Sequence, residues 1–260
     1  MIPTIVQRIA LTFAVVIMAA LLPAASLLAS DGKAALQSTD PERSRIEQII
    51  RNYLLDNPEL LVEVMRKLEA RQKAEEKAGL VDKIMANRGA LFASADDFIV
   101  NPAGKIPVVE FFDYQCGYCK RFTPTVTRLL NTDKTVRFVF KEFPILGEMS
   151  VIASRAALAA KMQGKYQAFH DAMMGLRRPL SEDLIYQTAT DVNIDIARLK
   201  SDMDRPEISR IIKDNRALAE ALGIRGTPSI VVGEQLAPGA ISYEQLTNLI
   251  DQARTNCTVC

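Results

Sequence analysis

Near the start of the chain, apolar residues recur at three- and four-residue intervals over two segments, and this spacing predicts two amphipathic helices. The first begins at Asp40-Pro41, where a capping residue precedes a proline at the first helical position, and it ends at Asp56-Asn57-Pro58. The second runs from Leu60 to Met85, with a charged middle at Glu69–Lys77. At about 30 residues it is far longer than the mean helix of about 11–12. Its apolar stripe could pack on the main domain, but self-association is the interpretation we favour.

After residue 95 the pattern changes to short apolar runs separated by turn residues. The predicted strands are Asp97–Val100, Ile106–Tyr114, Thr135–Phe143 and Ser229–Val232. The second of these runs is almost continuously apolar, as in a strand buried on both faces. A predicted helix, Cys116–Leu130, follows it, so the strand, the helix and the next strand form a βαβ unit with a parallel pair. A turn at Pro238-Gly239 and a last helix, Tyr243–Arg254, complete this part of the chain.

Residues 147–222, between the third and fourth predicted strands, are expected to be helical throughout. The predicted helices are Val151–Met162, Tyr166–Met174, Glu182–Thr190, Asp195–Met203 and Pro206–Leu222. The sequence therefore predicts an α/β domain over residues 95–255 that carries a helical insertion at about 147–222. A helical oligomerisation extension, residues 41–89, precedes it.

The first 29 residues have the organisation of a secretory signal peptide. Arg8 precedes an apolar run, Ile9–Leu22, and small residues follow Pro23. We expect cleavage between Ala25 and Ser30 and export to the periplasm. An uncleaved membrane anchor is the alternative, because the apolar stretch approaches the roughly 20 residues that span a bilayer.

The charge balance and the cysteine spacing limit the kinds of function that the chain can have. Lysine and arginine (32) nearly balance aspartate and glutamate (31), so electrostatics gives no reason to expect a nucleic-acid partner. The four cysteines form two C-x-x-C pairs, Cys116/Cys119 and Cys257/Cys260. Such close pairs are typical of reagents or metal ligands rather than of a disulfide framework that staples a domain. The single histidine, His170, lies at a helical core position.

The first pair stands where a predicted strand ends and a helix begins. Unpaired N–H groups and the positive end of the helix dipole stabilise a thiolate there, so the pKa of Cys116 should lie below the free value of about 8.5. The spacing places Cys119 one turn deeper on the same face. We expect Cys116 to be the exposed nucleophile and Cys119 the sheltered resolving thiol.

Several motifs together resemble the DsbA family of thiol–disulfide oxidoreductases, which have a thioredoxin fold with a helical insertion. They are Phe111–Cys119 (FFDYQCGYC), Lys141–Pro144 (KEFP) and Gly226-Thr227-Pro228 at the start of a strand. The N-terminal helices, with Asn57-Pro58-Glu59, resemble the oligomerising extension of the ScsC-type branch. The resemblance covers about residues 42–255.

The resemblance implies roles for further residues. Pro228 would be a cis proline that, with the Thr227 backbone, aligns a substrate strand beside the sulfurs. Glu110 would assist proton movement at Cys119, whereas without that role it would be a strand residue facing solvent. The dipeptide between the cysteines, Gly117-Tyr118, lacks the histidine of strongly oxidising members, so the pair should be a weaker oxidant.

The resemblance also implies partners. We expect disulfide exchange with exported proteins, with isomerase or reductase character rather than that of a pure oxidase. We also expect a membrane redox partner, a homo-oligomer that is a trimer, and no cofactor beyond the redox-active pair. The alternatives are a periplasmic copper- or zinc-handling protein and a structural protein with an inert disulfide.

The second cysteine pair departs from the family pattern. Cys257 and Cys260 lie in a short CxxC tail, residues 256–260, which the sequence predicts to be free. Three interpretations stay open for it: a disulfide without consequence, a resolving or electron-passing pair, and a clip for a soft metal such as Cu(I) or zinc.

Overall fold

The computed structural model describes residues 41–258 and 260, and the predicted signal peptide lies outside them. The chain divides into two compact units, the first ending at Glu63 and the second running from Val64 to Cys260. None of the helices in the described residues combines the length and hydrophobicity needed to cross a bilayer.

The described part of the first unit consists of α1 (Pro41–Asp56) and the first residues of α2 (Glu59–Ala86). These bounds confirm the two helices expected from the apolar spacing. α1 ends before Pro58, which has no backbone N–H to continue the helix, and the Asn57 side-chain amide and backbone N–H both donate to the carbonyl oxygen of Tyr53 in its last turn. None of the residues of α1 is buried, and Ile49 and Ile50 are 58% and 53% exposed. The apolar stripe of this helix therefore lies at the surface of the single chain.

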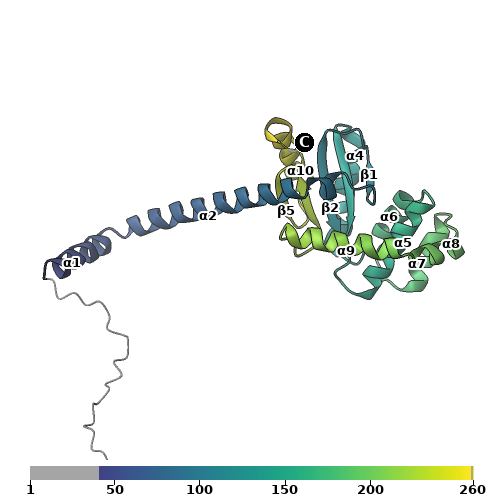
Figure 1. Cartoon of the computed structure of the whole chain (residues 1–260), viewed down its shortest axis with the longest axis horizontal. Coiled ribbons are helices and arrows are strands. Elements are labelled where there is room, and N and C mark those ends of the chain that lie inside the picture. The colour runs from purple at the N-terminus through teal and green to yellow at the C-terminus, as the bar shows by residue number, and fades with distance from the viewer. Residues whose placement is uncertain (1–40, 259) are drawn as a thin grey trace, which may run out of the picture. The chain divides into compact units, whose positions relative to one another are not determined.

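The second unit is built on a five-stranded mixed sheet (Figure 1). The strands, in sheet order, are β1 (Phe98–Val100), β3 (Val136–Glu142), β2 (Ile106–Phe112), β4 (Ser229–Val232) and β5 (Gln235–Pro238). β2 and β3 are parallel, as the βαβ pattern predicts, and the other neighbouring pairs are antiparallel. β2 is central and buried along its whole length.

The sequence pattern did not predict β5. The structure places the hairpin turn at Gly233-Glu234, where Gly233 has a φ of +54°, and Pro238 belongs to the strand itself. The predicted turn residue Gly239, with a φ of +83°, follows β5. A four-residue run that contains proline gives little strand signal, yet proline is tolerated on an edge strand because no ladder bond is lost there.

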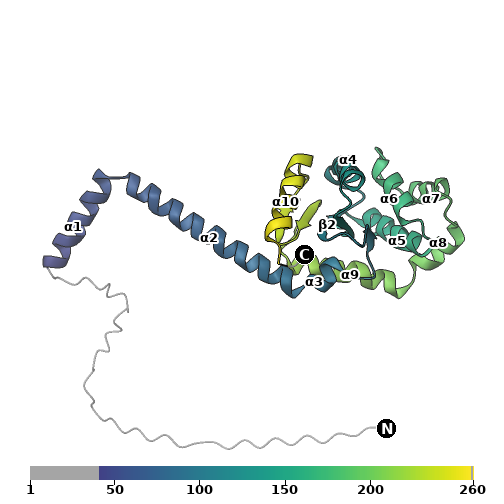
Figure 2. The same cartoon turned by 90° about the horizontal axis from the view of Figure 1, so that it is seen from above.

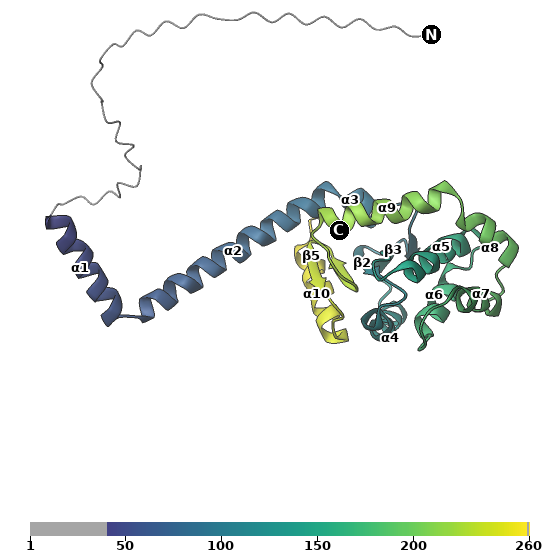
Figure 3. The same ribbon diagram turned by 90° about the horizontal axis from the view of Figure 1, so that it is seen from below.

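Helices cover both faces of the sheet (Figures 2 and 3). α4 (Gly117–Thr132) and α10 (Tyr243–Asn256) pack on one face, where Val108 and Phe112 of β2 join the larger core cluster. α3 (Arg88–Phe92) and the last turns of α9 (Pro206–Ala221) pack on the other face, against Val109 and Phe111. Successive side chains of β2 thus alternate between two apolar layers, which explains the continuous apolar run of its sequence.

The helical insertion is organised around α5 (Glu148–Met162). It packs with α6 (Tyr166–Gly175), α7 (Glu182–Asp191) and α8 (Ile196–Met203). Its five buried alanines allow close packing of its neighbours. α9 belongs to both parts: Ile208 and Ile211 pack on Leu158 of α5, whereas Leu218 packs under the sheet. The helices predicted over residues 147–222 are all confirmed.

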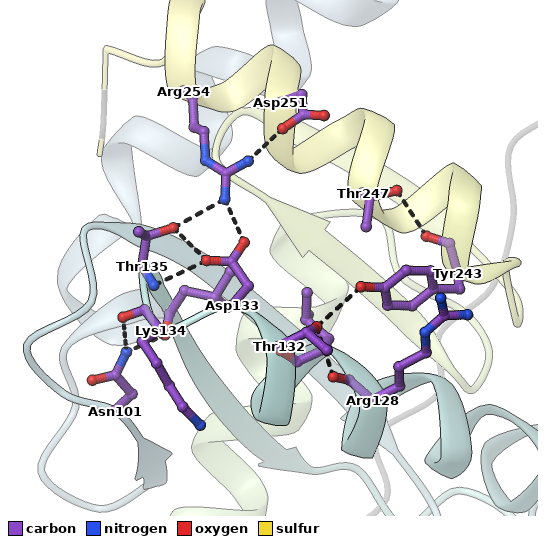
Figure 4. A network of polar contacts seen from close by, with 12 residues as sticks. Asn101, Arg128, Thr132, Asp133, Lys134, Thr135, Tyr243, Thr247, Asp251 and Arg254 are labelled. Carbon is purple, nitrogen blue, oxygen red and sulfur yellow. Dashed lines mark hydrogen bonds and ion pairs between the residues drawn. The ribbon is translucent and has the colours of Figure 1, made fainter.

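Polar contacts fix α10 to the rest of the domain (Figure 4). At its start, the hydroxyl groups of Tyr243 and Thr132 are 3.0 Å apart, and the Arg128 guanidinium lies 3.8 Å from the Tyr243 ring centroid. At its end, Arg254 forms ion pairs with Asp133 and Asp251. These contacts hold the last turn of α10 beside the start of β3.

Candidate active site

The first cysteine pair lies where β2 passes into α4. Cys116 is the N-cap residue of α4, and its Sγ atom accepts a hydrogen bond of 3.4 Å from the backbone N–H of Cys119. Both cysteines are free thiols in this structure. The position at the front of a helix is the one predicted from the sequence, and it places a sulfur where backbone N–H groups stabilise negative charge.

The environment of Cys116 lowers its pKa to about 5. The largest cause is a hydrogen bond from the side chain of Cys119, and hydrogen bonds from the Thr227 side chain and from backbone N–H groups add to it, while burial opposes them. The thiolate is therefore the main form at neutral pH. A thiolate is the form that attacks a disulfide.

The two thiols differ in burial less than the sequence predicted. Cys119 is fully buried, and burial raises its pKa far above the ordinary value. Cys116 is only 5% exposed, so the expectation that the nucleophile is exposed is wrong. The Thr227-Pro228 segment lies against the sulfur, which is 3.2 Å from the Thr227 carbonyl oxygen. Tyr118, by contrast, is 62% exposed.

The Thr227-Pro228 segment, just before β4, forms the remaining side of the Cys116 site. The Thr227–Pro228 peptide bond is cis, as expected from the proline at the start of this strand. A groove of about 530 Å³ adjoins it, lined by Tyr118, Arg225, Thr227 and Pro228 among others. Residues 111 positions apart in the sequence thus meet around one sulfur, with open space for a ligand beside them.

Glu110 of β2 is buried rather than exposed. Its residue is 3% exposed, so the interpretation of a solvent-facing strand residue is wrong. Burial and the nearby negative charge of Cys116 raise the pKa of Glu110 to about 8. Its own negative charge is in turn one of the causes that raise the pKa of Cys119. The carboxyl group is therefore electrostatically coupled to both sulfurs.

Asp113 is a site residue that the sequence analysis did not single out. Its buried carboxylate accepts hydrogen bonds from the backbone N–H groups of Gln115, Ile145 and Leu146, at 2.7, 2.8 and 3.0 Å, and from the Ser150 hydroxyl at 2.7 Å. It thereby ties the loop before Cys116 to the start of the helical insertion. The sequence feature that could have indicated this role is an aspartate in a loop three positions before Cys116, because aspartate side chains often accept hydrogen bonds from loop backbone N–H groups.

A second buried acid lies at the end of β3. The Glu142 carboxylate accepts hydrogen bonds from Ser154 and Tyr166, both 2.7 Å, and from Tyr114 at 3.2 Å. His170 Nδ1 lies 3.2 Å from the Tyr114 hydroxyl, and burial lowers the pKa of His170 to about 3. The histidine is therefore a neutral core residue, as its helical position predicted.

The second cysteine pair is not a free tail, as the sequence predicted, but a disulfide held against the sheet. Cys257 and Cys260 are bonded, and the backbone N–H of Thr258 donates to Glu234 at 2.7 Å. A Cβ atom on Gly233 would lie 2.9 Å from the sulfur of Cys257, which shows how closely the disulfide packs on the β4–β5 turn. In the bonded form neither sulfur is a thiolate ligand, and within residues 41–258 and 260 no group of three or more His, Cys, Asp or Glu side chains could hold a metal.

Comparison with known proteins agrees with this geometry. A family model described as DSBA-like thioredoxin domain matches residues 107–251, and one described as Copper resistance protein ScsC N-terminal domain matches residues 42–75. Among curated proteins, a Na(+)/H(+) antiporter NhaA of Salinispora tropica is 28% identical over 57% of this chain. The chain spans only 23% of that relative's length.

Two solved structures match at higher coverage. A thioredoxin-like oxidoreductase from Silicibacter pomeroyi is 45% identical, with a TM-score of 0.65, over 66% of this chain and 99% of the other. A linker-deletion mutant of Proteus mirabilis ScsC is 25% identical, with a TM-score of 0.64, over 86% of this chain and 99% of the other. The predicted fold, a thioredoxin fold with a helical insertion, is confirmed.

Proposed function

Because the chain belongs to the DsbA-like thioredoxin family of thiol–disulfide oxidoreductases, we propose that it is an exported enzyme that exchanges disulfides with protein substrates through Cys116 and Cys119. The observation that carries this proposal is the contrast between the two thiols. The pKa of Cys116 is lowered to about 5, whereas the fully buried Cys119 keeps its proton. The Cys116 sulfur is therefore ionised and able to attack a disulfide, whereas the Cys119 sulfur, one helical turn deeper, is still protonated.

The reaction follows from this contrast. The Cys116 thiolate attacks a substrate disulfide, forms a mixed disulfide and releases a substrate thiolate, which takes up a proton. Cys119 then loses its proton and attacks Cys116 Sγ, which releases the second substrate thiolate and leaves the Cys116–Cys119 disulfide. Isomerisation needs only the first step, followed by attack of another substrate thiol on the mixed disulfide.

Glu110 is the residue to which we assign the proton of Cys119. With a pKa of about 8 it exchanges protons readily near neutral pH, and it is electrostatically coupled to both sulfurs. Its charge repels a second negative charge on Cys119, so uptake of that proton by Glu110 must accompany the attack. This makes Glu110 a proton carrier for the resolving step.

The groove beside Pro228 supports a protein substrate. Tyr118, Thr227 and Pro228 line it, and Thr227 also contacts Cys116, so an extended substrate segment bound there would lie next to the sulfur. Because Cys116 is only 5% exposed and Thr227 lies against its sulfur, we expect a substrate disulfide to enter along this groove.

Isomerase or reductase character, rather than that of a strong oxidase, is supported by the pKa of Cys116. A value of about 5 lies between those of thioredoxin, about 7, and DsbA, about 3.5. Since a stabilised thiolate makes the disulfide a stronger oxidant, we expect a reduction potential between about −270 and −120 mV.

The N-terminal part of the chain supports two further parts of the proposal, assembly and export. The exposed apolar stripe of α1 would be covered in a homo-oligomer, and we assign a trimer by likeness to the ScsC-type branch. Export to the periplasm rests on the signal-peptide pattern of residues 1–29. There a membrane redox partner would maintain the redox state of Cys116 and Cys119.

The test is equilibration of the full mature chain in glutathione redox buffers, together with reactivation of scrambled ribonuclease. We expect an intermediate potential and reactivation that Cys116→Ser abolishes. The matched control, Cys257→Ser with Cys260→Ser, should keep both properties. A potential near about −120 mV without reactivation would show a dedicated oxidase instead.

A further inference from the structure

The disulfide between Cys257 and Cys260 lies in a groove of its own. This groove has a volume of about 470 Å³ and is lined by both cysteines together with Gly104, Lys105, Pro107 and Arg137. Cys260 is exposed and Cys257 is half-buried, so the bond is reachable from solvent. A volume of this size is in the range of small-molecule sites, about 300–1,000 Å³.

The groove lies at the opposite end of the sheet from Cys116. β2 begins beside the groove and ends before Cys116, and the antiparallel β4 begins after Pro228 and ends just before Gly233. The backbone N–H of Gly233 donates to the Pro107 carbonyl oxygen at 3.1 Å, which joins the two strand ends under the disulfide. The four residues of β4, Ser229–Val232, lie between Pro228 and Gly233, which puts these two residues about 16 Å apart. The second pair therefore cannot resolve the first within one chain.

The groove carries unsatisfied positive charge. Neither Lys105 nor Arg137 makes an ion pair or a side-chain hydrogen bond with any other residue that the structure describes, and the Arg137 Nε atom is buried without a partner. Arg254 also lines the groove, but its guanidinium is neutralised by Asp133 and Asp251 (Figure 4). None of the described residues that line the groove is acidic.

A disulfide sulfur and two unpaired cations in one small groove suit a ligand that carries both a thiol and carboxylates. The carboxylates would pair with Lys105 and Arg137, and the thiolate would reach the bonded sulfurs. We propose that this groove is a second redox site, at which a low-molecular-mass anionic thiol of about tripeptide size reduces the Cys257–Cys260 disulfide.

Two successive thiol–disulfide exchanges reduce the Cys257–Cys260 disulfide. The thiolate attacks Sγ of Cys260, the more exposed of the two residues, forming a mixed disulfide and releasing the Cys257 thiolate, which takes up a proton. A second thiolate attacks the sulfur of the bound thiol, releasing the Cys260 thiolate and forming the disulfide of the small thiol. Two thiol molecules are oxidised, the protein disulfide is reduced to two thiols, and the two protons pass from the small thiols to the cysteines.

The test uses the full mature chain with Cys116→Ser and Cys119→Ser, which leaves the second pair as the only redox group. Reduced glutathione is the probe, and free protein thiols and oxidised glutathione are measured over time. We expect both to appear in a ratio of two thiols per oxidised glutathione. With Cys257→Ser added, oxidised glutathione should form a mixed disulfide at Cys260, detected by mass spectrometry. Because the first pair is absent, failure here leaves the proposed function intact.

Charge recognition is tested with Lys105→Ala and Arg137→Ala in the same background. The rate with glutathione should fall at least about tenfold, whereas the rate with uncharged 2-mercaptoethanol should change by less than about twofold. The matched control, Arg178→Ala with Lys213→Ala, removes two exposed cations elsewhere and should leave both rates unchanged. Lys105→Ala alone and added salt give the same comparison if the double variant does not fold. Equal losses with both thiols, or a disulfide that glutathione does not reduce, would overturn the proposal.

Discussion

The Sγ atom of Cys116 lies 3.2 Å from the carbonyl oxygen of Thr227, although the two residues are 111 positions apart in the sequence. The contact joins the front of α4 to the start of β4, and it helps to explain why Cys116 is only 5% exposed. In the proposed function a substrate would approach along the groove beside Pro228, so the segment that covers Cys116 would also direct its substrate.

The ionisation of Cys116 predicts a specific pH dependence. The thiol should be half-ionised near pH 5, as measured by thiolate absorbance in the reduced protein with Cys116→Ser as the blank. Between pH 5 and the unfolded value of about 8.5, the unfolded thiol holds a proton that the native one has lost. The stability that Cys116 adds to the reduced protein therefore rises with pH across this window and is lost towards pH 5. Urea unfolding of the two proteins at several pH values checks this, and parallel curves would contradict it.

Replacing Tyr118 by histidine should make the pair a stronger oxidant. Tyr118 is exposed beside Cys116, with the Arg121 guanidinium 4.1 Å from its ring centroid. An imidazolium at this position adds positive charge near the thiolate, so the pKa of Cys116 should fall. We expect the reduction potential to rise by about 30 mV, equivalent to tenfold in the equilibrium constant. Tyr118→Phe should not shift it, and an equal shift in both variants would point to packing instead.

Glu110→Gln tests the proton carrier. The substitution keeps the shape of the side chain but removes a group whose pKa is raised to about 8. Attack of Cys119 on the mixed disulfide should slow at least about tenfold, and its pH–rate profile should lose the inflection that Glu110 causes. Attack by Cys116 should be little affected, because that step needs no proton from Cys119. Rapid-quench measurement of both steps separates them, and slowing of the first step alone would exclude this role.

Two glycines distinguish backbone strain from collision with the second disulfide. Gly233 and Gly239 both have positive φ, but only at Gly233 would a Cβ atom meet a sulfur, at 2.9 Å. Gly239→Ala should cost about 1 kcal/mol through the backbone alone. Gly233→Ala should cost about 1–3 kcal/mol more, because the packed disulfide has to shift. Chemical unfolding with and without Cys257→Ser and Cys260→Ser measures this, and an excess that persists without the disulfide would refute the explanation.

The α1 stripe predicts how the chain assembles. Ile49→Lys places a charge on an exposed apolar position, and we expect the assembly to dissociate to monomers in analytical ultracentrifugation. Gln48→Lys adds the same charge at an adjacent exposed position and should keep the assembly. Ribonuclease reactivation should fall with dissociation, whereas reduction of a small disulfide should not. A wild-type chain that sediments as a monomer would remove the oligomer from the proposed function.

Local sequence determined much of the fold because short-range physics controls its elements. Each of these elements could be predicted from its own residues: α2 from its apolar period, β2 from its continuous apolar run, and the helices between Gly147 and Leu222 from their apolar spacing. The position of Cys116 at the front of α4 followed in the same way, and with it the lowered pKa. The cis bond before Pro228 was also predictable, because the Gly226-Thr227-Pro228 motif resembles that of the DsbA family.

Only the tertiary structure decided what these elements bring together. β5 was hidden because a short edge strand is held by its neighbour rather than by its own pattern. The burial of Cys116 and Glu110 depends on Thr227 and on β4, which are more than 100 residues away in the sequence. The second disulfide, predicted to be on a free tail, gained a groove because α10 ends against the Gly233 turn and the start of β2. Whether a side chain is buried or its charge is paired depends on which residues lie next to it in space, and only the folded structure determines those neighbours.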